Sequence, residues 1–424
     1  MGGTTPAPGF GNASRHPGAL SGLRICDLSG QLAGAGATRL LAAFGAQVIR
    51  IEDPVTRGLW DIVRQMPPYL DDDHTPDGGA GFNNHNVEKL GITLNLRTER
   101  GRELLAELVR VSDAVTENFA AGVMERLGFG YDRLRELRPD VVYVSNCGFG
   151  HTGPYREFKS WGPIVQAVSG LTWSSGLPDR EPAGWGFSYM DHTGGYVMAI
   201  ALLAALWHRR RTGEGQWVDL SCSEAAIALN GPTLLDVTVN ERQLRRPGQP
   251  DSNRSTIPEM APHGIYPSSG DDDWVAIACR HDQDWRSLVA VVDQPWAKPD
   301  TTLAERLADQ DRLDADLSGW TAGRPREEVV ATLRAVGVPC AAVLRPSERC
   351  DEDKDLAAWG LWPTVEHTKH GPVRVDGLPV HLSATDWHVE RGGPCLGEHN
   401  DRVFTEVLGL TPTEIDELRD GGVI

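Results

Sequence analysis

The feature that most constrains the fold is a strand, a glycine-rich turn, a helix and a second strand in immediate succession. The stretch LRICDLS (23–29) favours a strand, ATRLLAAFG (37–45) favours a helix that ends at Gly45, and AQVIRIE (46–52) favours another strand. Such a succession is a βαβ pattern, whose two strands run parallel in one sheet.

The same alternation continues along the chain. Helical periodicity at 100–113 and 123–139 is followed by strand-like stretches at 114–119 and 141–150, and a helix over about 191–210 precedes a strand at 216–221. Strands that alternate with helices at these spacings predict an α/β fold with a mostly parallel sheet.

The composition changes near residue 240, where a polar stretch rich in Pro and Arg begins. After it, a hairpin is predicted at 264–279 and helices at 282–292 and 325–336, and near the end of the chain a capped helix is predicted to begin after Thr411 or Thr413. We therefore expect a disordered leader at 1–20, a large α/β domain at 21–225, a linker at 226–262 and a smaller α+β domain at 263–345.

Charge and cysteine usage limit the class of partner and the compartment. The net charge is −18, with 59 acidic against 41 basic side chains, which disfavours nucleic acid and anionic membranes as partners. The 7 cysteines are scattered without a CxxC pair, which fits reduced thiols better than a disulfide framework or a zinc site. The start lacks the pattern of a secretory signal and the apolar run at 196–207 is too short to span a bilayer, so we expect a cytoplasmic protein.

The glycine-rich turn GQLAGAGATRLL (30–41) allows a dinucleotide-binding interpretation, because glycines follow a strand and open a helix. Arg39, however, stands where the third glycine of the GxGxxG motif belongs, so we expect no NAD site, and an oxidoreductase is kept only as an alternative. The 13 histidines include no HxH, HExxH or His-Cys cluster, so we expect no metal.

Taken in order, several motifs resemble those of the family III CoA-transferases (CaiB/BaiF), which include formyl-CoA transferase, carnitine CoA-transferase and α-methylacyl-CoA racemase. They are LAGAGATRLLAAFGAQVIRIEDP, EKLGITLNL, ENFAAGVMERLGFGYDRL, CGFGHTGPYREF, VQAVSGL, DHTGGYVMAIALLAALW and LGEHN. The resemblance implies a Rossmann-like large domain and a smaller α+β domain, with residues 346–424 returning to the large domain. It also implies an interlocked homodimer that acts on acyl-CoA and a carboxylic acid.

The resemblance also implies a coenzyme A site in the large domain. Lys89 and Arg126 match basic residues that meet the phosphates and the nucleotide end of CoA. The glycine loop after the strand at 141–150 matches a loop whose backbone N–H groups stabilise an oxyanion. Leu32 stands where formyl-CoA transferase carries a glutamine, and Gln31 is one place earlier. The expected CoA contacts are Leu32, Ala33, Lys89, Asn118, Phe119, Arg126, Gly148, Phe149 and Gly150.

One position departs from the family pattern. Four residues before the glutamine of VQAVSG, the family's transferases carry an aspartate whose carboxylate attacks the acyl-CoA thioester, and the racemase uses the same residue in an acid–base pair. In this chain the position is Gly162, which has no side chain to act as a nucleophile. If the pocket keeps the family shape, Gly162→Asp should be tolerated.

Three explanations remain open at this stage. The chain is a CoA-transferase that uses another carboxylate or direct attack by the acceptor acid, it is the non-nucleophilic subunit of a heteromer with an aspartate-bearing paralogue, or it catalyses a different acyl-CoA reaction such as isomerisation, dehydration or racemisation. For the first, Asp191 is the nearest acid in sequence, and His192 and His263 are candidate bases. A role for Asp191 as a helix N-cap is the competing interpretation.

Overall fold

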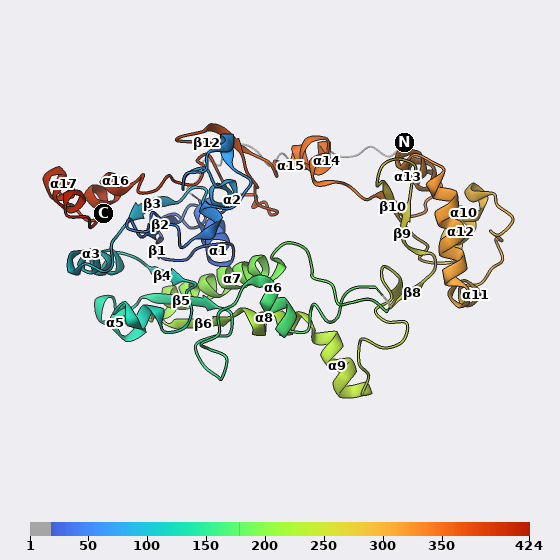
Figure 1. Ribbon diagram of the computed structural model, residues 1–424, viewed down its shortest axis with the longest axis horizontal. Helices are drawn as coiled ribbons and strands as arrows, with labels where there is room; N and C mark the ends of the chain where they lie inside the picture. Colours follow the sequence, from blue (N-terminus) through green and yellow to red (C-terminus); the bar gives the residue numbers. More distant parts are fainter. Residues whose placement is uncertain (1–17, 178) are drawn as a thin grey trace. The chain divides into compact units, whose positions relative to one another are not determined.

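A parallel β-sheet forms the centre of the first of two compact units. In the computed structural model, which describes residues 18–177 and 179–424, six strands lie in the order β3-β2-β1-β4-β5-β6, and every neighbouring pair runs parallel (Figure 1). The order reverses between β1 and β4, and the α/β class predicted from the sequence is confirmed. The strands are β1 (Arg24–Asp27), β2 (Gln47–Glu52), β3 (Leu90–Thr93), β4 (Ala114–Glu117), β5 (Val142–Cys147) and β6 (Trp217–Ser221).

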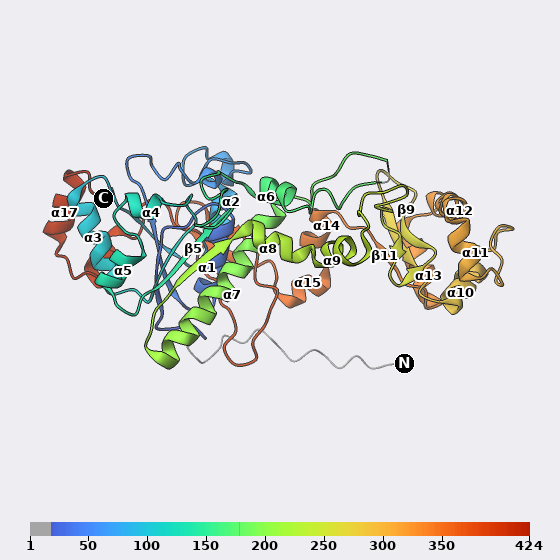
Figure 2. The same ribbon diagram turned by 90° about the horizontal axis from the view of Figure 1, so that it is seen from below.

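Helices cover both faces of this sheet (Figure 2). On one face, Leu104 of α3 and Phe404 of α16 belong to a buried core with Val115 of β4. On the other face, Leu41 of α1 and Leu202 of α7 belong to a second core with strand residues of opposite orientation. The helices are α1 (Ala33–Ala43), α3 (Glu99–Arg110), α4 (Val123–Arg126), α5 (Tyr131–Leu137), α7 (Tyr189–Thr212), α16 (Asn400–Glu406) and α17 (Pro412–Asp420).

The end of the chain packs on the edge strand β3. The backbone N–H of Gly91 donates to His399 Nδ1 at 3.1 Å, and that of Thr93 donates to Asn400 Oδ1 at 2.8 Å. The first unit accordingly comprises the residues up to Trp173 together with Gly184–Leu235 and Lys354–Ile424.

The second unit comprises Ser174–Ala183 and Asp236–Asp353. Its antiparallel sheet has the order β11-β10-β9, in which β9 and β10 form the predicted hairpin, and its core includes Trp285, Leu317 and Leu333. Its elements are β7 (Ser255–Thr256), β8 (Glu259–Met260), β9 (His263–Pro267), β10 (Trp274–Ala278), α10 (Asp282–Val292), α11 (Leu303–Ala308), α12 (Gln310–Ala322), α13 (Arg326–Ala335), β11 (Cys340–Ala342) and α14 (Pro346–Asp351).

Several shorter elements complete the chain. The linker predicted at 226–262 contains a helix and the β7–β8 pair, and the leader predicted at 1–20 falls largely outside the described residues. No helix within the described residues is both long and apolar enough to cross a membrane. The remaining elements are η1 (Ile62–Arg64), η2 (Leu70–Asp72), α2 (Ala80–His85), α6 (Gly162–Val168), α8 (Cys222–Leu229), α9 (Gly231–Asn240), α15 (Lys354–Trp359), β12 (Thr364–His367) and β13 (Gly371–Arg374).

Candidate functional site

A cleft of about 440 Å³ opens where β1, β4 and β5 end. Its walls come from the turn after β1, the loops after β4 and β5, and the first turns of α6 and α7. In a parallel sheet, the carboxyl ends of the strands on either side of a reversal in strand order are the usual place for a ligand. The lining residues include Gln31, Ala33, Trp60, Asn118, Phe119, Asn146, Cys147, Gly148, Phe149, Arg156, Phe158, Lys159, Trp161, Gly162, Asp191 and Cys222.

The turn after β1 presents Gln31 rather than Leu32 to this cleft. Gln31 has a positive φ of 56°, which turns the chain at this point, and it lines the cleft together with Ala33. Leu32 is buried and lines a different cavity, so the expectation that Leu32 contacts CoA in this cleft is not met. Gln31 is the residue of this turn that lines the cleft in its place. Asn118 holds the turn in place, because its side chain accepts from the Gly30 N–H at 2.7 Å and donates to the Gly30 carbonyl at 3.0 Å.

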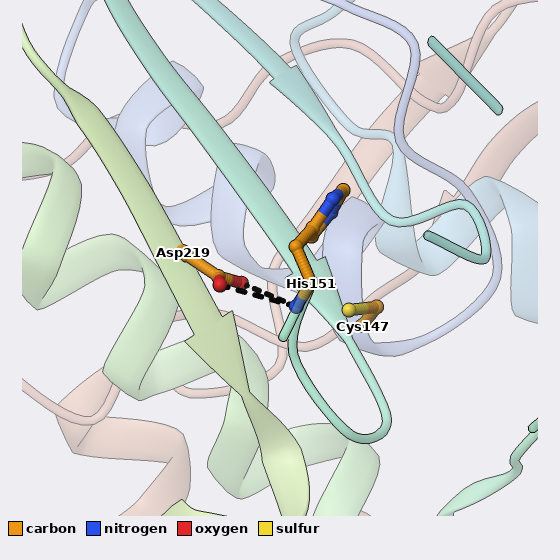
Figure 3. A group of neighbouring side chains, drawn as sticks. All are labelled: Cys147, His151 and Asp219. Atoms are coloured by element: carbon orange, nitrogen blue, oxygen red, sulfur yellow. Dashed lines mark hydrogen bonds between the residues drawn. The ribbon is translucent and has the colours of Figure 1, made fainter. Parts of the chain in front are cut away.

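The glycine loop after β5 is anchored to the neighbouring strand. The Gly148 carbonyl accepts from the N–H of Ser223 at 2.9 Å, and the N–H of His151 donates to both carboxylate oxygens of Asp219 at 3.1 Å (Figure 3). A side chain at Gly148 would overlap the hydroxyl of Ser160, which explains the glycine there. Gly148 and Phe149 line the cleft, whereas Gly150, with φ at 72°, is not among its lining residues.

Cys147, His151 and Asp219 form the one group among the described residues whose side-chain ligand atoms lie within 4.8 Å of one another in a way that could hold a metal ion. The Asp219 carboxylate already accepts a hydrogen bond from the loop backbone. Burial raises the pKa of the Cys147 thiol to about 12, and the backbone N–H groups of Phe149 and Gly150 donate to its sulfur. The three residues therefore anchor the glycine loop, and they are not proposed as a metal site.

Gly162 and Asp191 face each other inside the cleft. The N–H of Gly162, at the start of α6, donates to Asp191 Oδ2 at 3.2 Å. A Cβ at residue 162 would overlap Oδ2 and would lie 2.8 Å from Cγ of Asp191. The Asp191 carboxylate therefore occupies the space that a side chain at residue 162 would need. This corrects the expectation that Gly162→Asp is tolerated, because Asp191 would have to move.

Asp191 is the one acidic residue among the described residues that line the cleft. It lies in the first turn of α7, and the N-cap of that helix is Ser188, so the N-cap interpretation of Asp191 is wrong. Burial raises the pKa of its carboxyl group above the ordinary value, and the hydrogen bonds from Ser188 and from the backbone of Gly162 oppose that effect. A partly desolvated carboxylate of this kind is a stronger nucleophile than one in water.

Of the two histidines proposed as bases, one lies in each unit. His192 follows Asp191 but lines a separate cavity, where its ring centroid lies 5.7 Å from that of His85. His263 belongs to β9 in the second unit, where its Nδ1 lies 2.6 Å from the carbonyl oxygen of Asn253. Within the first unit, Asp191 lines the cleft and His192 does not, and a role for His263 stays a prediction.

Lys89 does not reach the cleft either. Its ammonium group is fully buried and contacts the carbonyl of Ala35 at 2.9 Å, Asn86 Oδ1 at 3.0 Å and Asp27 Oδ2 at 3.4 Å. The three N–H donors of a lysine are thereby engaged within the protein. The expectation that Lys89 meets the phosphates of CoA does not hold. No N–H donor of its ammonium group remains for a ligand, and the side chain is not exposed to solvent.

Positive charge at the cleft comes instead from residues that the sequence analysis did not single out. Arg156 and Lys159, in the exposed stretch after the glycine loop, line both the cleft and an adjoining cavity of about 470 Å³. Arg126, at the end of α4, lines the adjoining cavity. The signal in the sequence was the basic pair in PYREFKSW, which follows directly on CGFGHTG.

The comparisons with known proteins agree on one family. A model of CoA-transferase family III matches residues 20–400. A formyl-CoA:oxalate CoA-transferase of Streptomyces avermitilis is 33% identical over 96% of this chain and 99% of its own length. A succinyl-CoA–D-citramalate CoA-transferase of Chloroflexus aurantiacus is 31% identical over 97% and 100%. The crystal structure of a CaiB/BaiF family protein from Brucella suis, 28% identical, matches 92% of this chain and 100% of its own with a TM-score of 0.82.

Proposed function

The chain belongs to CoA-transferase family III, and on that premise we propose that it moves coenzyme A from an acyl-CoA donor to a carboxylic acid acceptor, with Asp191 as the nucleophile. The observation that carries this proposal is the position of the Asp191 carboxylate, which fills the space of the missing side chain at residue 162 within the cleft. Gly162 itself has no side chain that could form an aspartyl intermediate.

Each step of the transfer can be written on this carboxylate. An Asp191 oxygen attacks the thioester carbonyl, the carbon–sulfur bond breaks, and an acyl-aspartyl anhydride and CoA thiolate result. The thiolate then attacks the aspartyl carbonyl, which releases the donor acid and leaves an aspartyl-CoA thioester. The acceptor acid reverses the two steps: its carboxylate displaces the thiolate, and the thiolate takes the acceptor acyl group from the new anhydride. The carboxylate of Asp191 is regenerated.

The surroundings of Asp191 support this role. Gly148 and Phe149, at the carboxyl end of β5, line the same cleft and are the proposed site for the oxyanion of a tetrahedral intermediate. Ala33, Asn118 and Phe119 line the same cleft and are the proposed contacts of the CoA arm. Arg126, Arg156 and Lys159 are placed to attract the phosphates, which a chain of net charge −18 would otherwise repel.

We propose that the enzyme works as a cytoplasmic homodimer of the interlocked type. An exposed apolar stripe on α7 supports a second copy as its cover, because Tyr196, Ile200, Leu203 and Trp207 are 40 to 67% exposed at helical spacing. All seven cysteines lie within the described residues and are unpaired, which suits a reducing compartment.

Gly162 favours a second candidate role. A chain without the usual aspartate can be the non-nucleophilic subunit of a heteromer with an aspartate-bearing paralogue. An acyl-CoA isomerase, dehydratase or racemase on the same fold is a further alternative. The acid in the cleft argues against a non-nucleophilic subunit, which needs none, and the transferase activities named for the relatives favour CoA transfer over the other reactions.

The test uses the purified chain alone with succinyl-CoA and a panel of carboxylic acids, with the new thioesters measured by mass spectrometry. We expect transfer to at least one acid, its loss in Asp191→Asn with CoA binding retained, and wild-type rates in the matched control Asp420→Asn on exposed α17. No new thioester with any acid would overturn the transferase proposal. Full activity of Asp191→Asn would exclude the route through Asp191, and activity that appears only on mixing with a paralogue would support the heteromer.

A further inference from the structure

A second cavity, of about 240 Å³, lies in the first unit and shares no lining residue with the CoA cleft. It is formed by α1, α2, α7 and the segment 361–379 of the returning chain. Its volume is below the roughly 300–1,000 Å³ of pockets that take drug-sized ligands, so a CoA molecule does not fit and a compact molecule does. Its polar lining residues are Arg39, His85, His192, Tyr196, Trp362 and Asp376.

Two buried N–H groups of this lining have no hydrogen-bond partner among the described residues. They are Nε of Arg39 and Nε1 of Trp362. Arg39 is otherwise fixed, because its terminal nitrogen donates to the carbonyls of Asp376 and Gly377. A buried donor without an acceptor is destabilising, and such groups in native proteins call for an explanation. Because both side chains line the cavity, we take an acceptor group of a bound ligand as their missing partner.

The cavity also offers an acceptor without a donor. Nδ1 of His85 lies 2.9 Å from the carbonyl oxygen of Gly81, which makes Nδ1 the protonated nitrogen and leaves Nε2 with a free lone pair. Burial lowers the pKa of His85 to about 4, so the ring is neutral near pH 7. Asp376 is less available, because its Oδ2 accepts from Asn84 at 2.8 Å while its charge offsets that of Arg39.

We propose that this cavity is a second ligand site, and that it binds a small carboxylate carrying a hydroxyl group. The carboxylate oxygens accept from Arg39 Nε and Trp362 Nε1, and the hydroxyl donates to His85 Nε2. Because Arg39 and Asp376 largely cancel in charge, selectivity comes from these directed hydrogen bonds rather than from a net positive field. This site is independent of the transferase proposal.

Isothermal titration of the full-length chain with glycolate and L-lactate tests the site, with acetate and propionate as matched acids that lack the hydroxyl. We expect saturable binding of at least one hydroxy acid at one site per chain and about tenfold weaker binding of its matched acid. Trp362→Phe, which removes the N–H and keeps an aromatic ring, should weaken binding by a similar factor. Trp274→Phe in β10 is the matched control, because it removes an indole N–H in the other unit.

Two further measurements separate this site from the CoA cleft. Trp362→Phe should leave the affinity for CoA unchanged, and Asp191→Asn should leave the affinity for the hydroxy acid unchanged. Absence of saturable heat with all four acids, or equal binding by wild type and Trp362→Phe, would overturn the proposal. Loss of hydroxy-acid binding in Asp191→Asn would also overturn it, because the acid would then occupy the cleft.

Discussion

The carboxylate of Asp191 stands where a side chain at residue 162 would have to be, and it accepts a hydrogen bond from the N–H of Gly162. The two residues are 29 positions apart, on the first turns of α6 and α7. Their identities are therefore coupled: a glycine at 162 leaves room for an acid at 191, and an acid at 162 would exclude it.

This coupling predicts the outcome of a reciprocal exchange. Gly162→Asp alone should lower the free energy of unfolding by about 1–3 kcal/mol, because the new side chain overlaps the Asp191 carboxylate and adds a second charge beside it. The double variant Gly162→Asp/Asp191→Gly should recover much of that stability, less the roughly 1 kcal/mol that a glycine costs within a helix.

Activity of the exchanged variant is the sharper measurement. We expect the aspartyl-CoA adduct to map by peptide mass spectrometry to Asp191 in the wild type and to residue 162 in the double variant. The single variant Asp191→Gly should form no adduct. Wild-type stability of Gly162→Asp would contradict the overlap, and an adduct at neither position would contradict the nucleophile.

The raised pKa of Asp191 predicts a pH profile. Only the ionised carboxylate attacks the thioester, so kcat/KM should fall on the acid side of a pKa that lies above the ordinary value of 3.8. Because the folded state favours the protonated form, the stabilising contribution of this group is lost as the pH rises through its folded pKa. Asp191→Asn should therefore raise Tm at pH 7 and leave it nearly unchanged near pH 3, and an equal shift at both pH values would contradict the prediction.

The alternation of strands and helices was readable because both faces of a parallel sheet are buried and each helix has one apolar side. The helix predicted at 123–139 is instead α4 and α5, separated at Gly128 and Gly130. The helices α11 and α12 were not predicted, because α11 has only 6 residues and the apolar residues of α12 are sparse. At the site, the identity of the cleft followed from the family motifs. The pairing of Gly162 with Asp191 did not, because spatial overlap between two helices leaves no periodic signal in the sequence.

Side-chain direction was the other limit of the sequence. Gln31 and Leu32 are adjacent, and only the positive φ of Gln31 decides which one lines the cleft. Lys89 is a basic residue within a family motif, which suggested a ligand contact. In the structure its side chain is buried against Asp27, which indicates a structural role instead. A motif fixes where a residue lies along the chain, whereas backbone geometry fixes the side to which it points.

Glu117, at the end of β4, predicts a second pH dependence, this time of stability. Its carboxyl accepts from the hydroxyl of Tyr143 at 2.9 Å and from the N–H of Phe119 at 2.7 Å, but burial raises its pKa from 4.5 to about 7. Its stabilising contribution is therefore complete below about pH 4.5 and is lost as the pH rises through 7. Glu117→Gln, which cannot ionise, should gain roughly 3 kcal/mol relative to wild type between pH 5 and pH 9 in urea unfolding. A difference that does not change with pH would contradict this.

The stripe on α7 predicts the effect of a charge on assembly. Ile200 is 67% exposed, and if a second copy covers it, Ile200→Glu should weaken the dimer by about thirtyfold or more, because the carboxylate would lose its hydration at the interface. Val55→Glu, at a residue 54% exposed on a loop, is the matched control and should leave the mass unchanged. Light scattering after gel filtration distinguishes the outcomes, and an unchanged dimer in Ile200→Glu would place the interface elsewhere.

Lys89 and Lys159 predict opposite consequences of the same substitution. Lys89→Ala leaves the buried carboxylate of Asp27 without its ammonium partner, so the free energy of unfolding should fall by about 3–5 kcal/mol, while the fraction that remains folded should bind CoA normally. Lys159→Ala removes an exposed charge from the wall of the cleft, so stability should stay within about 0.5 kcal/mol of wild type and CoA binding should weaken several-fold, more at low salt than at high salt. Chemical denaturation and calorimetric titration of both variants separate the two roles. If Lys89→Ala kept its stability but bound CoA more weakly, Lys89 would contact the phosphates of CoA after all, which would contradict its assignment as a buried structural residue.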